Sequence, residues 1–413
     1  MNCLKLGYCN LQEKVIKYRN SPFFHKGRFG MTKKVKIMSI FGTRPEAVKM
    51  APLVAELEKD SSIESFVCVT AQHREMLDQV LDIFGITPDF DCNIMRQDQE
   101  LSDIAIEVLK GFSPILKEVK PDLVLVHGDT LTSFAAALAS FYNQVKVGHV
   151  EAGLRTGDKY QPYPEELNRV LNGHIADLHF APTLQSKENL LREGISKNIF
   201  VTGNTAIDSI KYTVKENYIF KEDILNKLDY DNKKIILLTA HRRENLGEPL
   251  ENICKAVLQI INEFEDVEIV YPVHLNPKVQ QTVRSILGEK KRTQLIAPIN
   301  IEEMHNLMAK VYLIATDSGG LQEEAPFFNK PTIVLRNVTE RPEGLQTGCL
   351  KLGGNDQESV YNAIKTLITN KNEYEKMANA PNPFGDGHSS DRIVEAIKYH
   401  FNITKDLPKE YTY

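Results

Sequence analysis

VYLIATDSGGLQEEAP (residues 311–326) joins an apolar run to a helical segment through two glycines, and this junction indicates the fold class. The run from Val311 is typical of a buried strand. A helix that begins directly after Ser318, Gly319 and Gly320 aims unpaired backbone N–H groups and its positive end at one point, which suits a phosphate. Glycine is also common wherever the backbone needs a positive φ, so this stretch alone is consistent with an anion site or with an empty turn.

The strand, turn and helix pattern of this stretch recurs on both sides of it. From Lys34, short β-branched runs alternate with helical segments; the pattern pauses in a polar stretch over residues 213–233 and resumes to the end of the chain. This alternation is the βαβ signature of a parallel sheet. We therefore expect an α/β fold of two doubly wound, Rossmann-like domains facing a cleft, with ligands at the carboxyl ends of the strands.

The expected domains follow from the polar pause. We place an N-terminal Rossmann-like domain at residues 31–212, a C-terminal one at 213–390, and a helix that crosses back to the first domain, with a tail, at 391–413. Residues 1–30 lack the apolar core of a signal peptide and precede Met31, which is a plausible natural start. We interpret them as a disordered or non-native extension, or as a short ordered one.

Composition excludes several classes of protein. The net charge of −5 gives no general attraction to nucleic acid or to anionic membranes, so an anionic ligand requires a local cluster of Arg, Lys and His. We expect neither a membrane nor a nucleic acid as a partner. The six cysteines are scattered without a CxxC pair, which favours reduced thiols and a cytoplasmic location.

Two missing motifs narrow the cofactor question. No GxGxxG follows the first expected strand, where FGTRPE stands instead, and the chain has no GxxxxGK[ST] loop. These absences argue against a tightly bound dinucleotide or a nucleoside triphosphate. The acidic stretch DFD, Asp89 to Asp91, has no second acidic cluster near it. We predict that it is solvated surface and that the protein uses no metal or other cofactor.

Polar side chains follow many of the expected strands. A His or Asp at one strand end is more often a cap or a satisfied hydrogen bond than a catalyst, but six strand ends that point to one cleft indicate a functional site. The residues concerned are Arg44, Asp129, Glu151, His241, His274 and Ser318.

Basic residues at helix starts are candidates for binding an anion. Arg44 and Lys49 lie in the first turns of a helix, where positive charge is unfavourable without an anion; the alternative is that they are surface charges. TAHRREN adds His241, Arg242 and Arg243, which suit a diphosphate or a carboxylate.

Further candidates follow the later strands of the second half. RNVTERPEG contributes Arg336 and Arg341. Glu324 can accept hydrogen bonds from a ribose diol, although a helix surface role is the alternative.

The segment HVEAGLRTGDKYQPYPEELNR, from His149, is long, polar and weakly periodic, as functional loops often are. Its Glu151, Glu165 and Glu166, together with Asp129, offer paired carboxylates for proton transfer. The alternative for Glu165 and Glu166 is charge at the start of a helix after Pro164, and we assign at least one of them that role.

Taken together, several long motifs resemble the non-hydrolysing UDP-N-acetylglucosamine 2-epimerases of bacteria and archaea, from about Met31 to about Lys398. The motifs are FGTRPEAVKMAPLV, HGDTLTS, HVEAGLRTGDKYQPYPEELNRVLNG, VTGNTAIDS, TAHRRENLGEP, YPVHLNP, TDSGGLQEEAP and TERPEG. The resemblance implies a glycosyltransferase-B type fold, a homodimer, and interconversion of UDP-N-acetylglucosamine and UDP-N-acetylmannosamine without NAD or an essential metal. It suggests a role in cell envelope polysaccharide synthesis.

That chemistry explains the residue types. The C2 proton of the sugar is not acidic, so direct removal needs an implausibly strong base. Loss of UDP makes C1 oxocarbenium-like and acidifies the C2 proton; a base then gives 2-acetamidoglucal, and re-addition with protonation on the other face inverts C2. Carboxylates near C2 and cations on the diphosphate are required.

The resemblance also assigns roles to individual residues. The acid and base work falls on Asp129, Glu151 and Glu165, without showing which acts on which face, and His241 falls at the diphosphate. The remaining site residues are Arg44 and Lys49 lining the site, Ser318, Gly319 and Gly320 on the diphosphate, Glu324 on the ribose and Arg341 near the phosphates.

Many bacterial members bind a second UDP-N-acetylglucosamine as an activator, through residues that match Gln72, Glu165, Arg242 and His274. This chain has Glu75 and Asp98 where those members often carry Gln and Arg, and like charges disfavour an anionic ligand. Activation by a second UDP-N-acetylglucosamine is therefore a hypothesis, and the charges of Glu75 and Asp98 argue against it.

Three alternatives stay open. A hydrolysing epimerase would release N-acetylmannosamine and UDP because water captures the intermediate. A retaining UDP-sugar glycosyltransferase would need an acceptor patch on the first domain, which we do not find. A non-enzymatic UDP-sugar sensor would not require the candidate carboxylates.

Overall fold

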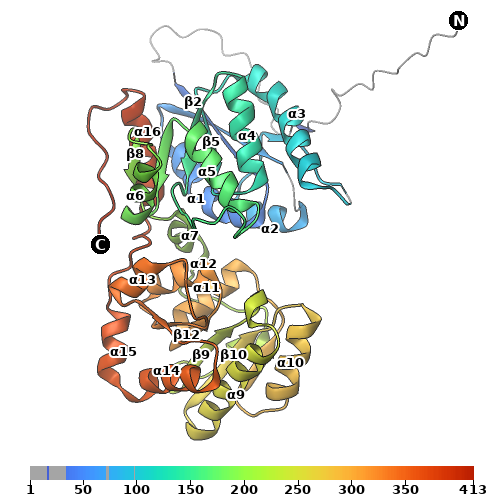
Figure 1. The fold of residues 1–413 in the computed structure, drawn as a ribbon, viewed down its shortest axis with the longest axis vertical. Helices are drawn as coiled ribbons and strands as arrows, with labels where there is room; N and C mark the ends of the chain where they lie inside the picture. Colours follow the sequence, from blue (N-terminus) through green and yellow to red (C-terminus); the bar gives the residue numbers. More distant parts are fainter. Residues whose placement is uncertain (1–15, 18–33, 71–73, 97) are drawn as a thin grey trace, which may run out of the picture. The chain divides into compact units, whose positions relative to one another are not determined.

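The computed structural model describes residues 16–17, 34–70, 74–96 and 98–413 (Figure 1). Apart from Ile16 and Lys17, the predicted extension over residues 1–30 lies outside the described residues. Met31, Gln72 and the side chain of Glu75 also lie outside them.

The chain divides into two compact units. Unit 1 comprises Met1–Thr205 and His388–Glu410, and unit 2 comprises Ala206–Gly387 and Tyr411–Tyr413. The division falls after Thr205, seven residues before the end of the 31–212 domain proposed from sequence. Part of the polar stretch belongs to the core of unit 2, since Phe220 and Leu225 are buried there.

Unit 1 is built on an eight-stranded sheet in the order β1-β4-β3-β2-β5-β6-β7-β8. Neighbouring strands are parallel except β1, which pairs antiparallel with β4. The strands are β1 (Ile16–Lys17), β2 (Val35–Phe41), β3 (Ile63–Val69), β4 (Phe90–Asp91), β5 (Leu123–His127), β6 (Lys146–Val150), β7 (Leu178–Ala181) and β8 (Ile199–Val201).

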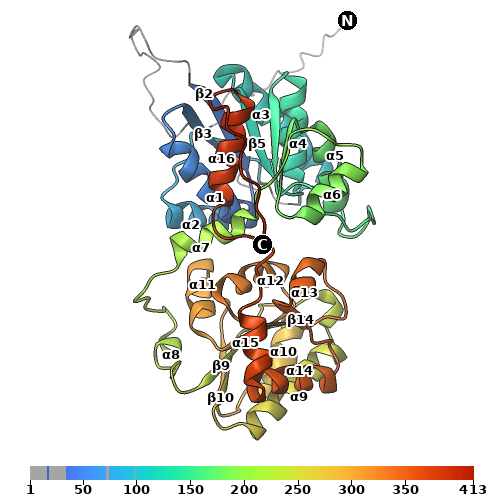
Figure 2. The ribbon, with the colours of Figure 1, turned by 90° about the vertical axis from the view of Figure 1, so that its left-hand side faces the viewer.

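Helices cover both faces of this sheet (Figures 1 and 2). Met38 and Ile40 of β2 pack in one core cluster with α3 and α4, and the chain's last helix, α16, returns to lie beside α1. The helices are α1 (Arg44–Lys59), α2 (Arg74–Phe84), α3 (Leu101–Val119), α4 (Leu131–Tyr142), α5 (Glu165–Ile175), α6 (Leu184–Arg192) and α16 (Ser389–His400).

Unit 2 contains a six-stranded parallel sheet in the order β11-β10-β9-β12-β13-β14. Successive residues of a strand point to opposite faces, so Ile236 and Leu238 of β9 pack with α9, α10 and α14, whereas Ile235 and Leu237 pack on the other side with α8 and α11. Burial on both faces explains why these strands are continuous apolar runs.

The strands of unit 2 are β9 (Lys234–Thr239), β10 (Val267–Pro272), β11 (Thr293–Ile296), β12 (Leu313–Thr316), β13 (Thr332–Val334) and β14 (Leu350–Leu352). Its helices are α7 (Thr205–Thr213), α8 (Asp223–Asn226), α9 (Glu248–Glu263), α10 (Pro277–Leu287), α11 (Ile301–Lys310), α12 (Gly319–Glu324), α13 (Pro342–Thr347), α14 (Gln357–Thr369) and α15 (Lys371–Ala378), with short 3₁₀ turns η2 (Arg243–Asn245) and η3 (Ala325–Phe328). Two parallel sheets with alternating helices confirm the predicted α/β class.

Each sheet has a point where the strand order reverses direction. In unit 1 it lies between β2 and β5, and in unit 2 between β9 and β12. Doubly wound sheets bind their ligands outside the carboxyl ends of the strands at such a point. The candidate residues Arg44 and Asp129 follow β2 and β5, and His241 and Ser318 follow β9 and β12.

The prediction that DFD is solvated surface is wrong. Asp89 and Asp91 are buried, and Phe90–Asp91 forms β4 beside β3. Their carboxylates satisfy backbone donors, because Asp89 Oδ2 accepts from Val67 N at 2.8 Å and Asp91 Oδ1 accepts from Asn93 N at 2.7 Å. Hydrogen bonds to local backbone offset the cost of burying these charges.

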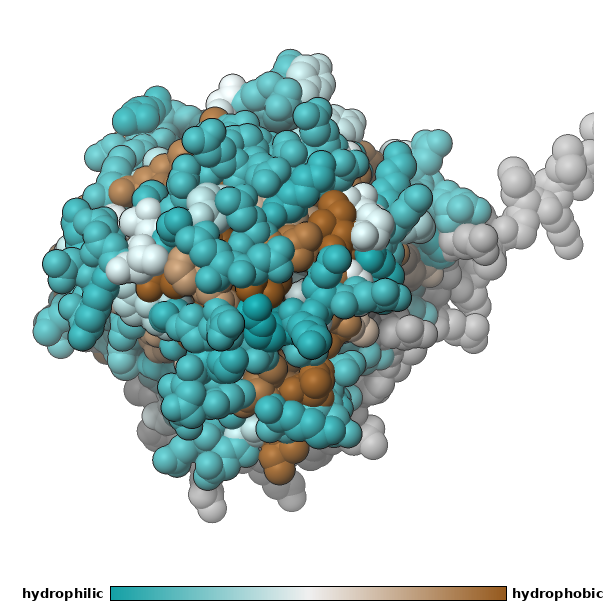
Figure 3. Space-filling model, turned by 90° about the horizontal axis from the view of Figure 1, so that it is seen from below, coloured by the Kyte–Doolittle hydropathy of each residue, from teal (hydrophilic) through white to brown (hydrophobic). Residues whose placement is uncertain are grey.

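Hydrophilic residues cover most of the face shown in Figure 3, with apolar residues showing between them. Apolar surface of this scattered kind is ordinary for a folded domain. None of the helices in the described part of the chain combines the length and apolar character that a membrane span requires.

We expect Gly42→Ala to destabilise unit 1. A Cβ at this turn after β2 would lie 2.0 Å from Thr70 Oγ1 and 3.0 Å from Thr132 Oγ1. Such overpacking typically lowers the free energy of unfolding by about 2 kcal/mol. Urea unfolding should show this loss of stability. The loss should be smaller in a Thr70→Ala background, where the closest atom is gone. Equal costs in both backgrounds would contradict the steric explanation.

Candidate active site

Glu151 is the centre of the site in unit 1. It follows β6, its backbone has a φ of 62°, and its side chain is 7% exposed. Lys49 donates to its Oε2, Asn204 Nδ2 lies 3.3 Å from the same oxygen, and His127 Nε2 lies 3.8 Å away. Burial would raise the pKa of Glu151, but Lys49, His127 and Arg169 together hold it well below its usual range. The carboxylate is therefore ionised at neutral pH.

Arg169 of α5 connects the two carboxylates that follow β5 and β6. Its guanidinium donates to Asp129 Oδ2 and to the backbone oxygen of Glu151 at 2.9 Å, and it lies 3.4 Å from Glu151 Oε1. Arg169 is itself buried, and although burial alone would lower its pKa, Asp129 and Glu151 raise it. A buried cation between two acids offsets the repulsion between them.

Glu165 and Glu166 begin α5 but have different surroundings. Glu166 is buried and accepts from the backbone N–H groups of Thr156, at 3.1 Å, and Gly157, at 3.0 Å. It therefore holds the loop before α5, which is a structural role. Glu165 is partly buried, and its Oε2 has no hydrogen-bond partner among the described residues. This oxygen is buried, and its capacity to accept hydrogen bonds is unused among the described residues.

The carboxylate of Glu46 accepts hydrogen bonds from the backbone of the turn after β2. Glu46 is buried and accepts from Gly42 N at 3.0 Å, Thr43 N at 2.8 Å and Thr130 Oγ1 at 2.6 Å. Burial raises its pKa in spite of these hydrogen bonds. The Glu46 side chain thus links the start of α1 to that of α4. Arg44 lies at the same turn, and partial burial lowers the pKa of its guanidinium.

Three histidines lie beneath this edge of the sheet. His149 Nε2 donates to Gly128 O at 2.7 Å, and His179, its cross-strand neighbour, donates to Gly173 O at 2.8 Å. Burial lowers the pKa of both, and it lowers that of His127 to about 4. All three are therefore neutral at physiological pH.

In unit 2, Asp317 organises the strand ends. It is fully buried, and its Oδ2 accepts from the backbone N–H groups of His241 and Arg242, each at 2.8 Å, and from Asn245 Nδ2 at 2.9 Å. The His241 ring stacks on His274, with centroids 5.1 Å apart and an interplanar angle of 5°. Burial, His274 and Arg242 lower the pKa of His241, whereas Asp317 raises it, with a net lowering.

The turn after β12 gathers positive charge. Ser318 makes no side-chain cap to α12, so its hydroxyl does not occupy the N–H groups at the helix start. A Cβ on Gly319 would lie 3.3 Å from Arg341 Cζ and 3.4 Å from Arg242 Nη2, which places two guanidinium groups against this turn. Glu323 holds Arg341 through hydrogen bonds of 2.9 and 2.7 Å. N–H groups at a helix start that no side chain caps, with guanidiniums nearby, suit a phosphate.

Glu324, at the end of α12, is buried beside a histidine. Its Oε2 lies 3.3 Å from His305 Nε2, and His305 Nδ1 is 2.6 Å from Thr213 Oγ1. Glu324 is therefore not in the exposed environment expected under the alternative, in which it is a helix surface residue.

Arg336 has a structural partner instead of a free guanidinium. It forms two hydrogen bonds with Glu340, of 2.7 and 3.0 Å. Although burial opposes it, this pairing lowers the pKa of Glu340 to about 2.

The residues of the activator hypothesis are only partly described. Gln72 lies outside the described residues, and so does the side chain of Glu75. Asp98 is exposed. Arg242 and His274 lie together with His241 in unit 2. The binding of a second nucleotide sugar therefore stays a hypothesis.

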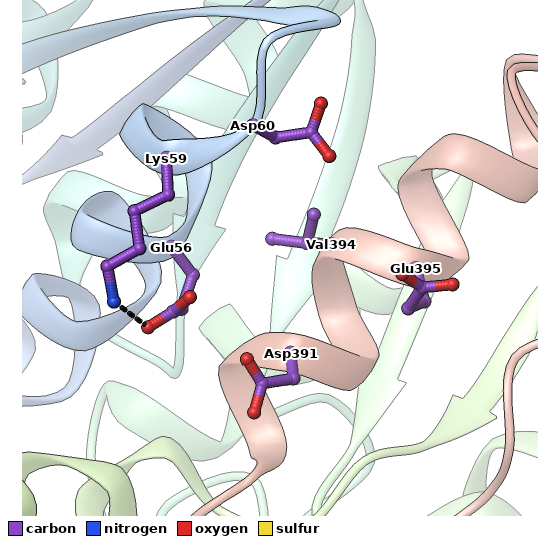
Figure 4. A pocket seen from close by; sticks show the side chains of 6 residues that line it. All are labelled: Glu56, Lys59, Asp60, Asp391, Val394 and Glu395. Carbon is purple, nitrogen blue, oxygen red and sulfur yellow. Dashed lines mark hydrogen bonds and ion pairs between the residues drawn. The ribbon is translucent and has the colours of Figure 1, made fainter.

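A separate hollow of about 210 Å³ lies between α1 and α16 (Figure 4). Acidic side chains dominate it, but they have partners of their own: Lys398 lies 3.1 Å from Asp60, and Lys59 lies 2.6 Å from Glu56. None of the sequence-predicted site residues lines this hollow. Within the described ranges no group of three or more His, Cys, Asp or Glu side chains is arranged to hold a metal ion.

Sequence reasoning missed the residues that hold the site together, chiefly Arg169, Asp317, Glu323 and His305. Arg169 lies four residues after Glu165, one helical turn further on the same face, a spacing that gives a usable signal. Asp317 directly precedes the turn that sequence analysis singled out. For Glu323 and His305 we find no signal in a single sequence.

Comparisons with known proteins identify the relatives of this chain. The family model described as UDP-N-acetylglucosamine 2-epimerase matches residues 55–398. The UDP-N-acetylglucosamine 2-epimerase of Bacillus subtilis is 56% identical over 381 residues, which is 92% of this chain and 99% of that protein.

Two solved structures are similar over most of their length. The Neisseria meningitidis UDP-GlcNAc 2-epimerase bound to UDP-GlcNAc has a TM-score of 0.80 at 46% identity, covering 88% of this chain and 99% of that one. The S. aureus MnaA-UDP co-structure has a TM-score of 0.83 at 52% identity, covering 92% of this chain and 100% of that one.

We expect Lys49→Met to raise the pKa of Glu151 and to destabilise unit 1. A carboxylate with a lowered pKa contributes stability above its ordinary pKa and loses it as the pH falls. Removing one partner of a buried pair costs about 3 kcal/mol near neutral pH, and the difference from wild type should narrow below about pH 4.5. Carbon-13 NMR of the Glu151 carboxyl gives its pKa, and urea unfolding gives the free energy of unfolding.

The matched control for this variant is Lys59→Met on the same helix, whose partner Glu56 makes a mostly exposed pair. Exposed pairs contribute at most about 1 kcal/mol. If both variants behave alike, Lys49 does not stabilise the Glu151 carboxylate.

The buried histidines should make unit 1 sensitive to acid. Because their folded pKa lies below the ordinary value near 6.5, the unfolded chain binds more protons, so stability falls as the pH drops below about 6.5. In His149→Gln and His179→Gln, where an amide replaces the Nε2 donor, urea midpoints should depend less on pH between about 7 and about 5. His174→Gln, at an exposed position, should keep the wild-type slope, and equal slopes in all variants would refute this explanation.

Proposed function

The chain belongs to the UDP-N-acetylglucosamine 2-epimerase family, and from that premise we propose that it interconverts UDP-N-acetylglucosamine and UDP-N-acetylmannosamine by eliminating and re-adding UDP, without hydrolysis. The observation that carries the proposal is the pair of carboxylates Asp129 and Glu151, which follow the neighbouring strands β5 and β6 and are held together by Arg169, next to the point where the strand order of unit 1 reverses. A reaction that develops positive charge at one carbon and moves a proton at its neighbour needs carboxylates at both places.

Unit 2 holds the UDP part of the substrate in this proposal. The diphosphate lies on Ser318, Gly319 and Gly320, with Arg341 and His241 close to the phosphates. This is supported by the guanidinium groups against Gly319 and by relatives whose structures contain UDP or UDP-GlcNAc. Glu324 accepts from the ribose hydroxyls, and Arg44 adds a positive charge at the site.

The first chemical step breaks the bond between C1 and the UDP oxygen. The electron pair leaves with UDP, where cations stabilise the developing negative charge. C1 becomes oxocarbenium-like, and a carboxylate takes the C2 proton to give 2-acetamidoglucal. UDP then adds back while a proton arrives on the opposite face of C2, so atoms and charge balance over the cycle.

The surroundings of the three carboxylates suggest a division of labour. Glu151 is surrounded by Lys49, Arg169 and His127 and is held ionised, which suits stabilisation of positive charge at C1. Asp129 is about a quarter exposed, and Glu165 has an unpartnered oxygen among the described residues. We propose that these two exchange protons with C2 from opposite faces, Lys49 serving to balance the charge of the site.

The homodimer and the role in cell envelope polysaccharide synthesis follow from the family resemblance. The cytoplasmic location is proposed from the scattered cysteines, and the absence of a cofactor from the missing nucleotide-binding motifs together with the resemblance. The elimination step needs no redox cofactor, because the carbon skeleton is neither oxidised nor reduced overall.

The proposal is tested by following both nucleotide sugars from either direction with purified protein. We expect Asp129→Asn to lose at least about 100-fold in kcat, since general acid and base groups contribute about 10² to 10⁴. Glu188→Gln on α6 is the control, because Glu188 is exposed and forms a surface pair with Arg192 at 3.4 Å. It should retain wild-type activity.

Two outcomes would overturn the proposal. Full turnover by Asp129→Asn would remove that residue from the chemistry. Accumulation of N-acetylmannosamine and UDP in equal amounts, without UDP-N-acetylmannosamine, would instead favour the hydrolysing alternative.

A further inference from the structure

One oxygen of the buried Asp317 carboxylate, Oδ1, has an unusual environment. Asp317 is fully buried, and its Oδ2 is saturated by donors from His241, Arg242 and Asn245. Its Oδ1 has no hydrogen-bond partner in the described ranges of the chain. A buried anionic oxygen without a donor is costly, so its position calls for an explanation.

The ring of His241 is the titratable group that lies next to this oxygen. Its Nδ1 lies 3.6 Å from Asp317 Oδ1, slightly beyond a hydrogen bond. The side chain of His241 is 38% exposed, whereas Asp317 is not exposed at all. The histidine therefore has one nitrogen facing a buried acid.

The ring is held in a defined plane. His274 stacks on it almost in parallel. Asp317 also anchors the backbone of His241 and Arg242, so the acid fixes the main chain and faces the side chain of the same residue. Other charged or titratable groups close enough to act on this pair are Arg242, Arg336 and Tyr271.

From this geometry we infer that Asp317 is a positioning residue that keeps the His241 proton on Nδ1 and stabilises the imidazolium form when a diphosphate binds at Nε2. The inference rests on the proposed function, in which His241 lies at the diphosphate. An aspartate that orients a histidine in this way fixes its tautomer and stabilises its charged form.

The consequence for the reaction concerns the departure of UDP. When the bond between C1 and oxygen breaks, its electron pair goes to the UDP oxygen. An Nε2–H of the imidazolium donates a hydrogen bond to the diphosphate as this charge develops. Asp317 Oδ1 then accepts the Nδ1–H hydrogen bond that it lacks in the free protein.

Asp317→Asn separates this role from a purely structural one. The Asn oxygen can still accept from the three donors that Oδ2 serves. The Asn amide then faces His241 Nδ1 with hydrogens, which forces this nitrogen to accept, moves the ring proton to Nε2 and blocks the imidazolium. The substitution therefore keeps the loop anchored and reverses the tautomer.

The first readout is the nitrogen-15 NMR spectrum of the histidine rings, with His241 assigned through His241→Gln. At about pH 8 we expect wild type to carry its proton on Nδ1 when free and on both nitrogens when saturated with UDP. Asp317→Asn should carry its proton on Nε2 in both states. Identical spectra for wild type and Asp317→Asn would overturn the inference, whether or not the protein proves to be an epimerase.

The second readout is the kinetics of epimerisation. We expect Asp317→Asn to lose at least about 100-fold in kcat while KM changes less than about fivefold, by analogy with the loss of orientation in a catalytic triad. In wild type we expect kcat to vary with pH as His241 titrates. In Asp317→Asn this dependence on pH should be absent. A KM effect alone would contradict a role in the step that breaks the bond.

Asn245→Ala is the matched control for loop anchoring. It removes one donor from Asp317 Oδ2 and a 3.0 Å hydrogen bond to Leu335 O, but it leaves Oδ1 facing His241. We expect it to lower the melting temperature and to retain the Nδ1 tautomer. If Asn245→Ala reproduces the kinetic loss of Asp317→Asn at equal stability, loop order explains both variants and the inference fails.

Discussion

Two carboxylates at neighbouring strand ends repel each other, and the site in unit 1 depends on how that repulsion is balanced. The sheet order brings Asp129 and Glu151 to one edge, because β5 and β6 are adjacent. Arg169 comes from α5 and Lys49 from α1. The packing of these two helices against the sheet is therefore coupled to the ionisation of the site. Each buried carboxylate is stable only when the helix that carries its cationic partner is in place.

Unit 2 uses a buried acid for a different purpose. Asp317 gathers the loop after β9 onto the end of β12 through one oxygen and directs the other toward His241. Glu46 has a related role in unit 1, where it links the starts of α1 and α4. In both units a residue that never needs to touch a substrate fixes the backbone from which the functional side chains project.

The α/β class and most strands were predictable because buried parallel strands are continuous apolar runs, as in β9. The family motifs also gave the candidate residues around both strand-order reversals. DFD was misjudged, because Asp89 is buried against Val67, 22 residues earlier in the chain, whose backbone N–H donates to it, a contact that no local pattern reveals. Arg169 and His305 were missed for the same reason: their partners are distant in sequence, and only tertiary packing brings them together.

The most direct test of the central claim is a proton NMR time course with UDP-N-acetylglucosamine in D₂O, without NAD or an acceptor. We expect UDP-N-acetylmannosamine to grow with deuterium at C2, and deuterium to enter C2 of the remaining substrate as the reaction reverses. Epimerised product that retains the original proton would contradict proton exchange between the substrate and the carboxylates of unit 1.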